Sequence, residues 1–128
     1  RNAGKLDADR SRIYLVGHSS GAHLAAVALT TDWQKDYDPA LPENFIRSAV
    51  LCSGMYDLHP VRLSSRSAYV KFDDDLEFKL SPQRHLERIV VPVVLVYGTR
   101  ETPEFQRQSI DFDKALRDAG KSTRLVVA

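Results

Sequence analysis

Four short apolar runs divide the chain and predict the strands of a sheet. Each run is rich in Val, Ile, Leu or Tyr without regular polar alternation, which is typical of parallel strands covered on both faces. The clearest run is Val93-Val94-Leu95-Val96, and Pro92 is acceptable as the first residue of its strand. The four expected strands cover residues 12–16, 47–53, 92–97 and 123–127.

Two longer segments have the pattern of helices. Residues 20–30 are small or apolar on nearly every side, so this helix is expected to be buried against the sheet. Residues 102–119 have one apolar face, with Thr102 as the expected N-cap, Pro103 in the first turn and Gly120 after the last turn. The residues expected on the apolar face are Phe105, Phe112, Leu116 and Ala119.

The remaining segments are polar or irregular. Residues 1–11 have the pattern of a helix end and a turn, and residues 31–44 that of a loop with two prolines. Residues 58–90 are expected to form a cap-like section with short helices, one of them capped by Ser81. The run Asp73-Asp74-Asp75 lacks the spacing of a metal-binding loop and is expected to be a solvated loop.

Strands and helices therefore alternate along the chain as β-α-β, an irregular helical section, and again β-α-β. Such an order predicts an α/β fold in which a parallel sheet with right-handed crossovers is flanked by helices. The length of 128 residues suits one domain, residues 1–128, with a real core.

The composition is that of an ordinary globular domain, with 43% apolar residues, 27% charged residues and a formal net charge of +1. The basic residues are scattered, which argues against nucleic acid as a partner. No apolar run reaches the ~20 residues of a membrane span. Cys52 is the only cysteine, which excludes an internal disulfide and suits a reducing, cytoplasmic compartment. We expect no membrane partner, no cofactor and no bound metal.

One motif, Gly17-His18-Ser19-Ser20-Gly21, joins the first strand to the first helix. A tight strand-to-helix turn needs room, and the two flanking glycines keep Cβ atoms out of it. Such a turn exposes the Ser19 hydroxyl above the carboxyl edge of the sheet. It also places the Ser20 N–H at a helix N-terminus, where an oxyanion is stabilised. The alternative is a plain βα turn in another open α/β sheet, such as a nucleotide-binding fold.

Residues 14–26, which contain the G-x-S-x-G motif, and the block Glu101-Thr102-Pro103-Glu104-Phe105-Gln106-Arg107-Gln108 carry a family resemblance. Together they resemble the kynurenine formamidase (arylformamidase) and carboxylesterase branch of the α/β-hydrolases. The resemblance covers essentially the whole chain and implies the second half of that fold, with strands equivalent to the fifth to eighth. It implies Ser19 as nucleophile, the Ser20 N–H as an oxyanion donor and Glu101 as triad acid, where many relatives have Asp.

The same resemblance implies a serine hydrolase that cleaves a small ester or formamide, with N-formylkynurenine as the named option. In this family a His-Gly-Gly segment supplies another oxyanion donor and a histidine after the eighth strand is the base. Both would lie outside these 128 residues. Because the chain begins at Arg1 without Met and stops within an expected strand, we expect a part of a larger protein. The alternative is a non-catalytic truncated fragment or an assembly subunit, and a homo-oligomer is a further option.

Other residues are rivals for these roles. Asp57 follows the second strand, where some hydrolases carry the acid, and is otherwise expected in a turn before Pro60. Cys52 lies within a strand and is expected to be a small core residue rather than a nucleophile. The four histidines are expected to be structural or surface residues: His18, His23, His59 and His85. Three aromatic residues can line a substrate pocket or belong to the core: Trp33, Phe45 and Tyr56.

Overall fold

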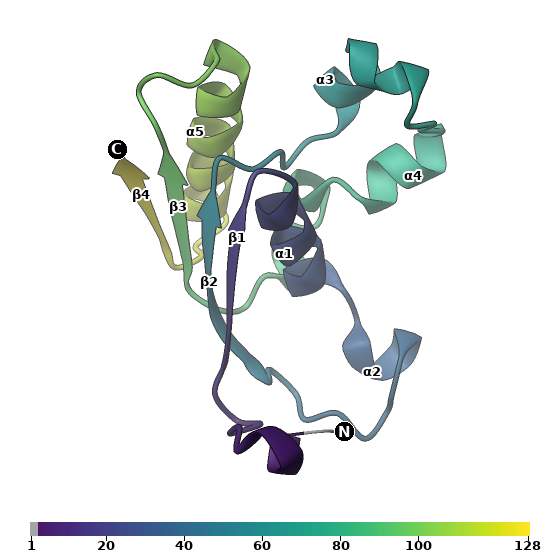
Figure 1. The fold of residues 1–128 in the computed structure, drawn as a ribbon, viewed down its shortest axis with the longest axis vertical. Helices are drawn as coiled ribbons and strands as arrows, with labels where there is room; N and C mark the ends of the chain where they lie inside the picture. The colour runs from purple at the N-terminus through teal and green to yellow at the C-terminus, as the bar shows by residue number, and fades with distance from the viewer. Residues whose placement is uncertain (1–2) are drawn as a thin grey trace.

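The computed structural model describes residues 3–128 and contains a four-stranded parallel sheet (Figure 1). The strands lie in the order β1-β2-β3-β4, so neighbours in the sequence are also neighbours in the sheet. Each neighbouring pair is parallel. The strands are β1 (Ile13–His18), β2 (Ile46–Cys52), β3 (Val93–Tyr97) and β4 (Thr123–Val127). The expected α/β fold with a parallel sheet is thereby confirmed.

Two helices pack on this sheet and share one core with it. Helix α1 (Ser20–Thr30) contacts β1 and β2, whereas α5 (Pro103–Asp118) contacts β3 and β4. Side chains from both helices join strand residues in a single buried cluster. The most deeply buried members include Ala22, Ala26, Ala49, Leu51, Val93, Leu95, Phe112 and Leu116. Alternate strand residues point to the same face of a sheet, so this cluster covers one face.

The first strand is less covered than its sequence suggests. It lies at the edge of the described sheet, and the side chains of Tyr14 and Val16 are 60% and 75% exposed. Leu24 on α1 is also exposed. The expectation that β1 is covered on both faces is therefore wrong for the described residues, whereas α1 is buried as expected along most of its length. An apolar pattern shows which side chains favour burial, but it does not show which element covers them.

Two segments expected as loops contain short helices. Helix α2 (Trp33–Asp36) begins after Asp32, whose carboxylate accepts a hydrogen bond from the backbone N–H three residues later at 3.1 Å. Helix α4 (Asp74–Lys79) begins after Asp73, which caps in the same way at 2.7 Å. An aspartate at this position satisfies an N–H that has no partner inside the helix. The acidic run thus starts a helix and is not a solvated loop.

Residues 58–90 connect β2 to β3 through short helical pieces. The pieces are α3 (His59–Arg62), η2 (Ser65–Ala68), α4, η3 (Pro82–Arg84) and η4 (Leu86–Arg88). Ser81 occupies the expected N-cap position of η3, but its side chain makes no capping hydrogen bond. Its buried hydroxyl instead donates to the Glu77 carbonyl at 2.6 Å and accepts from the Leu58 N–H at 2.9 Å. Ser81 therefore joins the start of the section to α4.

The termini of the remaining helical segments follow local chemistry. Thr102 occupies the N-cap position of α5, but its side chain makes no capping hydrogen bond. Gly120 has φ +70°, and the N–H of Lys121 donates to the Leu116 carbonyl at 2.9 Å, which closes the helix. Before β1, the expected helix end is a short 3-10 helix, η1 (Ala3–Leu6). Residues 1 and 2 lie outside the described residues.

Candidate functional site

Ser19 lies in the turn between β1 and α1, at the carboxyl edge of the sheet. Its backbone has φ 54° and ψ −119°, a conformation that is rare for a residue with a side chain and is found at strained functional turns. The Ser19 N–H donates to the Cys52 carbonyl at 2.8 Å, and the Ser19 carbonyl accepts from Ala22 and His23 in the first turn of α1. The Ser19 hydroxyl makes no capping hydrogen bond to α1, so it is available for chemistry.

The glycine before this turn is required by close packing. A Cβ atom on Gly17 would lie 2.3 Å from the Gly21 carbonyl oxygen and 2.6 Å from the Ala22 nitrogen, inside the 3.0 Å that real Cβ contacts keep. The glycine after the turn is different, because a Cβ on Gly21 would meet no described atom within 4 Å. The expectation that both glycines make room is therefore correct for Gly17 and wrong for Gly21 among residues 3–128.

Ser20 is the first residue of α1. The first N–H groups of a helix have no acceptor within the helix, and the helix dipole adds partial positive charge at this end. The Ser20 N–H therefore lies beside Ser19 in an environment that favours a negatively charged oxygen. This arrangement is the one that an oxyanion donor requires.

Glu101 lies in the turn between β3 and α5, with one carboxylate oxygen fully engaged. Its Oε1 accepts hydrogen bonds from the Ser53 hydroxyl at 2.5 Å and from the Gly98 N–H at 2.8 Å. Its Oε2 is buried and accepts no hydrogen bond from the described residues. A buried carboxylate oxygen favours a hydrogen-bond donor, so this atom is suited to receive one from another group.

The structure brings Ser19 and Glu101 to the same edge of the sheet through β2. Ser19 follows β1, and its N–H donates a hydrogen bond to the carbonyl of Cys52, the last residue of β2. The hydroxyl of the next residue, Ser53, donates a hydrogen bond to Glu101, and its N–H donates to the Val96 carbonyl of β3 at 2.8 Å. Cys52 itself is half-buried in β2.

The histidines of this chain are engaged elsewhere or stand on the surface. His23 Nε2 lies 2.8 Å from the Leu80 carbonyl oxygen, and His85 Nε2 lies 2.8 Å from the Phe78 carbonyl oxygen. His59 Nδ1 lies 3.2 Å from Glu77 Oε1. His18 ends β1 and is exposed. Among residues 3–128, no hydrogen bond links a histidine ring to Ser19.

Asp57 belongs to a separate polar cluster. Its Oδ1 accepts from the His59 N–H at 3.1 Å, as expected for a turn, and from the Arg84 guanidinium at 3.1 Å. Arg84 also contacts the buried Glu77 carboxylate at 2.7 Å, and Arg62 contacts it at 3.2 Å. Hydrogen bonds from Arg84, then Arg62 and His59, lower the pKa of Glu77 from 4.5 to about 2. This cluster holds α3, α4 and η3 together, and among residues 3–128 no hydrogen bond or ion pair links it to Glu101.

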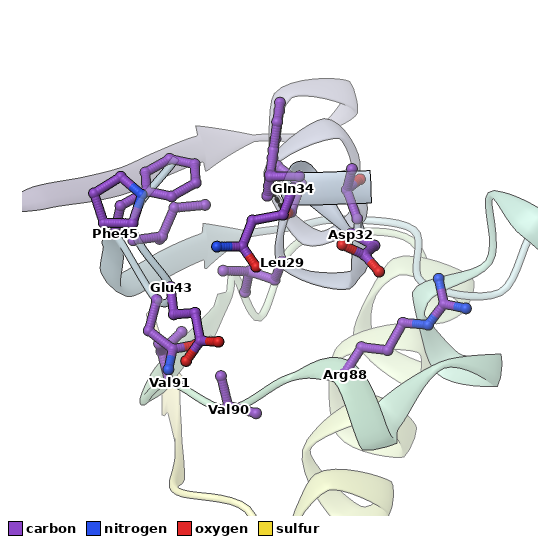
Figure 2. A pocket seen from close by; sticks show the side chains of 14 residues that line it. Leu29, Asp32, Gln34, Glu43, Phe45, Arg88, Val90 and Val91 are labelled. Carbon is purple, nitrogen blue, oxygen red and sulfur yellow. Dashed lines mark hydrogen bonds between the residues drawn. The ribbon is translucent and has the colours of Figure 1, made fainter. Parts of the chain in front are cut away.

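The three aromatic residues divide between core and pocket. Tyr56 is fully buried and stacks on Phe112 with ring centroids 4.3 Å apart, and burial raises the pKa of its phenol. Trp33 and Phe45 line a pocket of about 200 Å³, which Arg88 also borders (Figure 2). This pocket lies at the C-terminal end of α1, the opposite end from Ser19, so it does not serve the Ser19 site.

One residue of the candidate site, Ser53, is not predicted from the sequence. Its residue type alone gives no signal, although a polar residue directly after a parallel strand lies where α/β sheets bind ligands. Among the described residues, no group of three or more His, Cys, Asp or Glu side chains is placed to hold a metal ion. No helix in the part of the chain that the structure describes is long and apolar enough to cross a membrane.

Comparison with known proteins identifies relatives that are named as hydrolases. No family model matches the chain. It is 38% identical over 116 residues to the kynurenine formamidase of Danio rerio, covering 86% of this chain and 38% of that protein. It is 31% identical over 141 residues to the esterase LipQ of Mycobacterium tuberculosis, covering 95% of this chain and 32% of that protein. The chain thus spans about a third of the length of these curated relatives.

A solved structure supports the same fold. The acylaminoacyl peptidase of Pyrococcus horikoshii superposes with a TM-score of 0.75 and 23% identity, covering 95% of this chain and 20% of that one. On the parallel sheet, the strand–serine–helix turn and the formamidase and esterase relatives, the chain belongs to the α/β-hydrolase superfamily, and it contains part of that fold.

Proposed function

We propose that the protein is a serine hydrolase that cleaves a small ester or formamide. The observation that carries the proposal is the backbone of Ser19, which has φ 54° at the N-terminus of α1 with its hydroxyl not used as a cap. The names of the relatives, kynurenine formamidase and esterase, support a carbonyl bonded to nitrogen or oxygen as the group attacked. N-formylkynurenine is the candidate substrate.

In the proposed reaction, Ser19 Oγ adds to the substrate carbonyl carbon while a base removes the hydroxyl proton. The carbonyl oxygen becomes an oxyanion, and the Ser20 N–H stabilises it together with a donor from another part of the protein. One such donor contributes about 3–4 kcal/mol of barrier lowering when it is correctly placed. The protonated base then gives its proton to the leaving amine or alcohol, and water hydrolyses the acyl-enzyme.

Glu101 is proposed to be the acid of the triad. Its Oε1 is held by Ser53 and Gly98, and its buried Oε2 accepts no hydrogen bond from the described residues. An imidazole Nδ1–H donating to Oε2 would be held in the tautomer that serves as a base. The proposed base is a histidine from another part of the polypeptide, because among residues 3–128 no histidine ring is hydrogen-bonded to Ser19, and the rings of His23, His59 and His85 have other contacts.

The test uses the purified full-length protein with N-formylkynurenine and with 4-nitrophenyl acetate. Ser19→Ala is expected to lower kcat by about a thousandfold or more, since the nucleophile is lost. Ser122→Ala is the matched control, because Ser122 is exposed and precedes β4 at the other edge of the sheet. Full activity in Ser19→Ala on both substrates would overturn the proposal.

A further inference from the structure

The hydroxyl of Ser53 is the closest contact of the Glu101 carboxylate. Its Oγ donates to Glu101 Oε1 at 2.5 Å, and Ser53 is only 7% exposed. Building on the proposed function, we infer that Ser53 is a positioning residue. It fixes the Glu101 carboxylate so that Oε2 is directed towards the histidine of the triad.

Two donors hold the same oxygen from two neighbouring strand ends. Ser53 follows β2, and Gly98, whose N–H donates at 2.8 Å, follows β3. Ser53 is itself tied to β3 by its N–H, which donates to the Val96 carbonyl at 2.8 Å. Hydrogen bonds to a carboxylate are roughly twice as strong as neutral ones. The carboxylate is therefore fixed relative to the sheet and not only to its own loop.

The glutamate side chain needs this support because of its length. Compared with aspartate, it has one more rotatable bond between the backbone and the carboxylate. A Cβ on Gly98 would lie 3.1 Å from Glu101 Oε1, which shows how closely the carboxylate approaches this residue. Without the Ser53 hydroxyl, the Gly98 N–H would be the remaining described donor to the carboxylate. The direction of Oε2 would then be less restricted.

The backbone of Ser53 gives independent support. Ser53 has φ 54°, a value that glycine adopts readily and that is strained for a residue with a Cβ. Ser19 shares this feature, and the two residues follow adjacent strands. A side chain at such a position adds strain unless its own contacts compensate, and the contact of Ser53 is with the proposed acid.

The strained backbone also provides a clean test. Ser53→Gly removes the hydroxyl and relieves the positive φ, so it separates catalysis from stability. In the full-length protein we measure kcat and KM for 4-nitrophenyl acetate, the rate at which a fluorophosphonate labels Ser19, and the urea midpoint of unfolding. We expect kcat and the labelling rate to fall by about ten- to a hundredfold, as for loss of a hydrogen bond to a charged group. KM should stay within about twofold and stability should not decrease.

Two further variants complete the test. Ser53→Ala keeps the Cβ and removes only the hydroxyl, and it should show the same loss of kcat. In a Glu101→Ala background, Ser53→Gly should lower kcat no further, because there is no carboxylate left to position. Parent-like kcat in either Ser53 variant, or full additivity with Glu101→Ala, would overturn this inference. It would leave the proposed function intact, since that depends separately on Ser19→Ala.

Discussion

Gly17→Ala should damage the turn that holds Ser19, and the structure sets the size of the effect. The new Cβ would lie 2.3 Å from the Gly21 carbonyl oxygen, 2.4 Å from its carbon and 2.6 Å from the Ala22 nitrogen. These are backbone atoms at the start of α1, which cannot rotate away as a flexible side chain can. Overpacking of this kind costs about 1–3 kcal/mol and occasionally more, so we expect a loss of about 3 kcal/mol in the free energy of unfolding.

The matched control is Gly21→Ala, in the same motif four residues later. A Cβ there meets no described atom within 4 Å, and alanine is favoured over glycine within a helix by up to about 1 kcal/mol. Its stability should therefore equal or slightly exceed that of the parent. The assay is urea unfolding of the full-length protein followed by circular dichroism.

The same Gly17→Ala variant should also lose activity, because a shift of about 1 Å in a reacting group can lower the rate by about a hundredfold. Hydrolysis of 4-nitrophenyl acetate measures this. An unfolding midpoint equal to that of the parent, together with unchanged kcat, would show that the turn is not packed as described.

Three further predictions concern parts of the fold outside the turn. Glu77 has a lower pKa when folded, about 2, than its ordinary 4.5, so its ionised form contributes stability above pH 4.5 that is lost as the pH falls towards 2. Glu77→Gln should therefore flatten the pH dependence of urea unfolding across that range. Asp113→Ala should lower the free energy of unfolding by about 1–3 kcal/mol, because the buried Asp113 carboxylate accepts hydrogen bonds from Arg117 at 2.8 Å and Thr123 at 2.9 Å and joins α5 to β4. Calorimetry measures this loss, and an unchanged melting temperature would contradict the prediction. Gly120→Ala should lower the free energy of unfolding by about 1–2 kcal/mol in the same measurement, since φ +70° is strained for alanine.

Local sequence patterns predict much of this fold. The sequence predicts the ends of β4 and α1 to the residue, because dense apolar runs and a change of period mark them. Gly120 ends α5 at a positive φ, which glycine adopts without strain. The loops were harder: a single aspartate, Asp73, begins a helix in an acidic run that has no helical period of its own.

Other features depend on contacts between distant segments and cannot be read from one stretch. Ser81 stands at the N-cap position of η3, but its hydroxyl bonds Leu58 and Glu77 instead of the helix N-terminus. The exposure of Val16 depends on what lies beside β1, not on the residue.

The candidate site divides in the same way. The motif around Ser19 is local, so its turn could be predicted from spacing alone. The block after β3 indicated Glu101 through a family resemblance and not through geometry. The hydrogen bond from Ser53 joins residues that are 48 positions apart, and only the register of β2 and β3 brings them together.

The most direct test of the account is to locate the residue that reacts with a serine-directed fluorophosphonate. The full-length protein is labelled, digested and analysed by peptide mass spectrometry, with Ser19→Ala treated in parallel. We expect one adduct on Ser19 of the parent and none at that position in the variant. An unlabelled Ser19 in a preparation that hydrolyses 4-nitrophenyl acetate would contradict its role as the nucleophile.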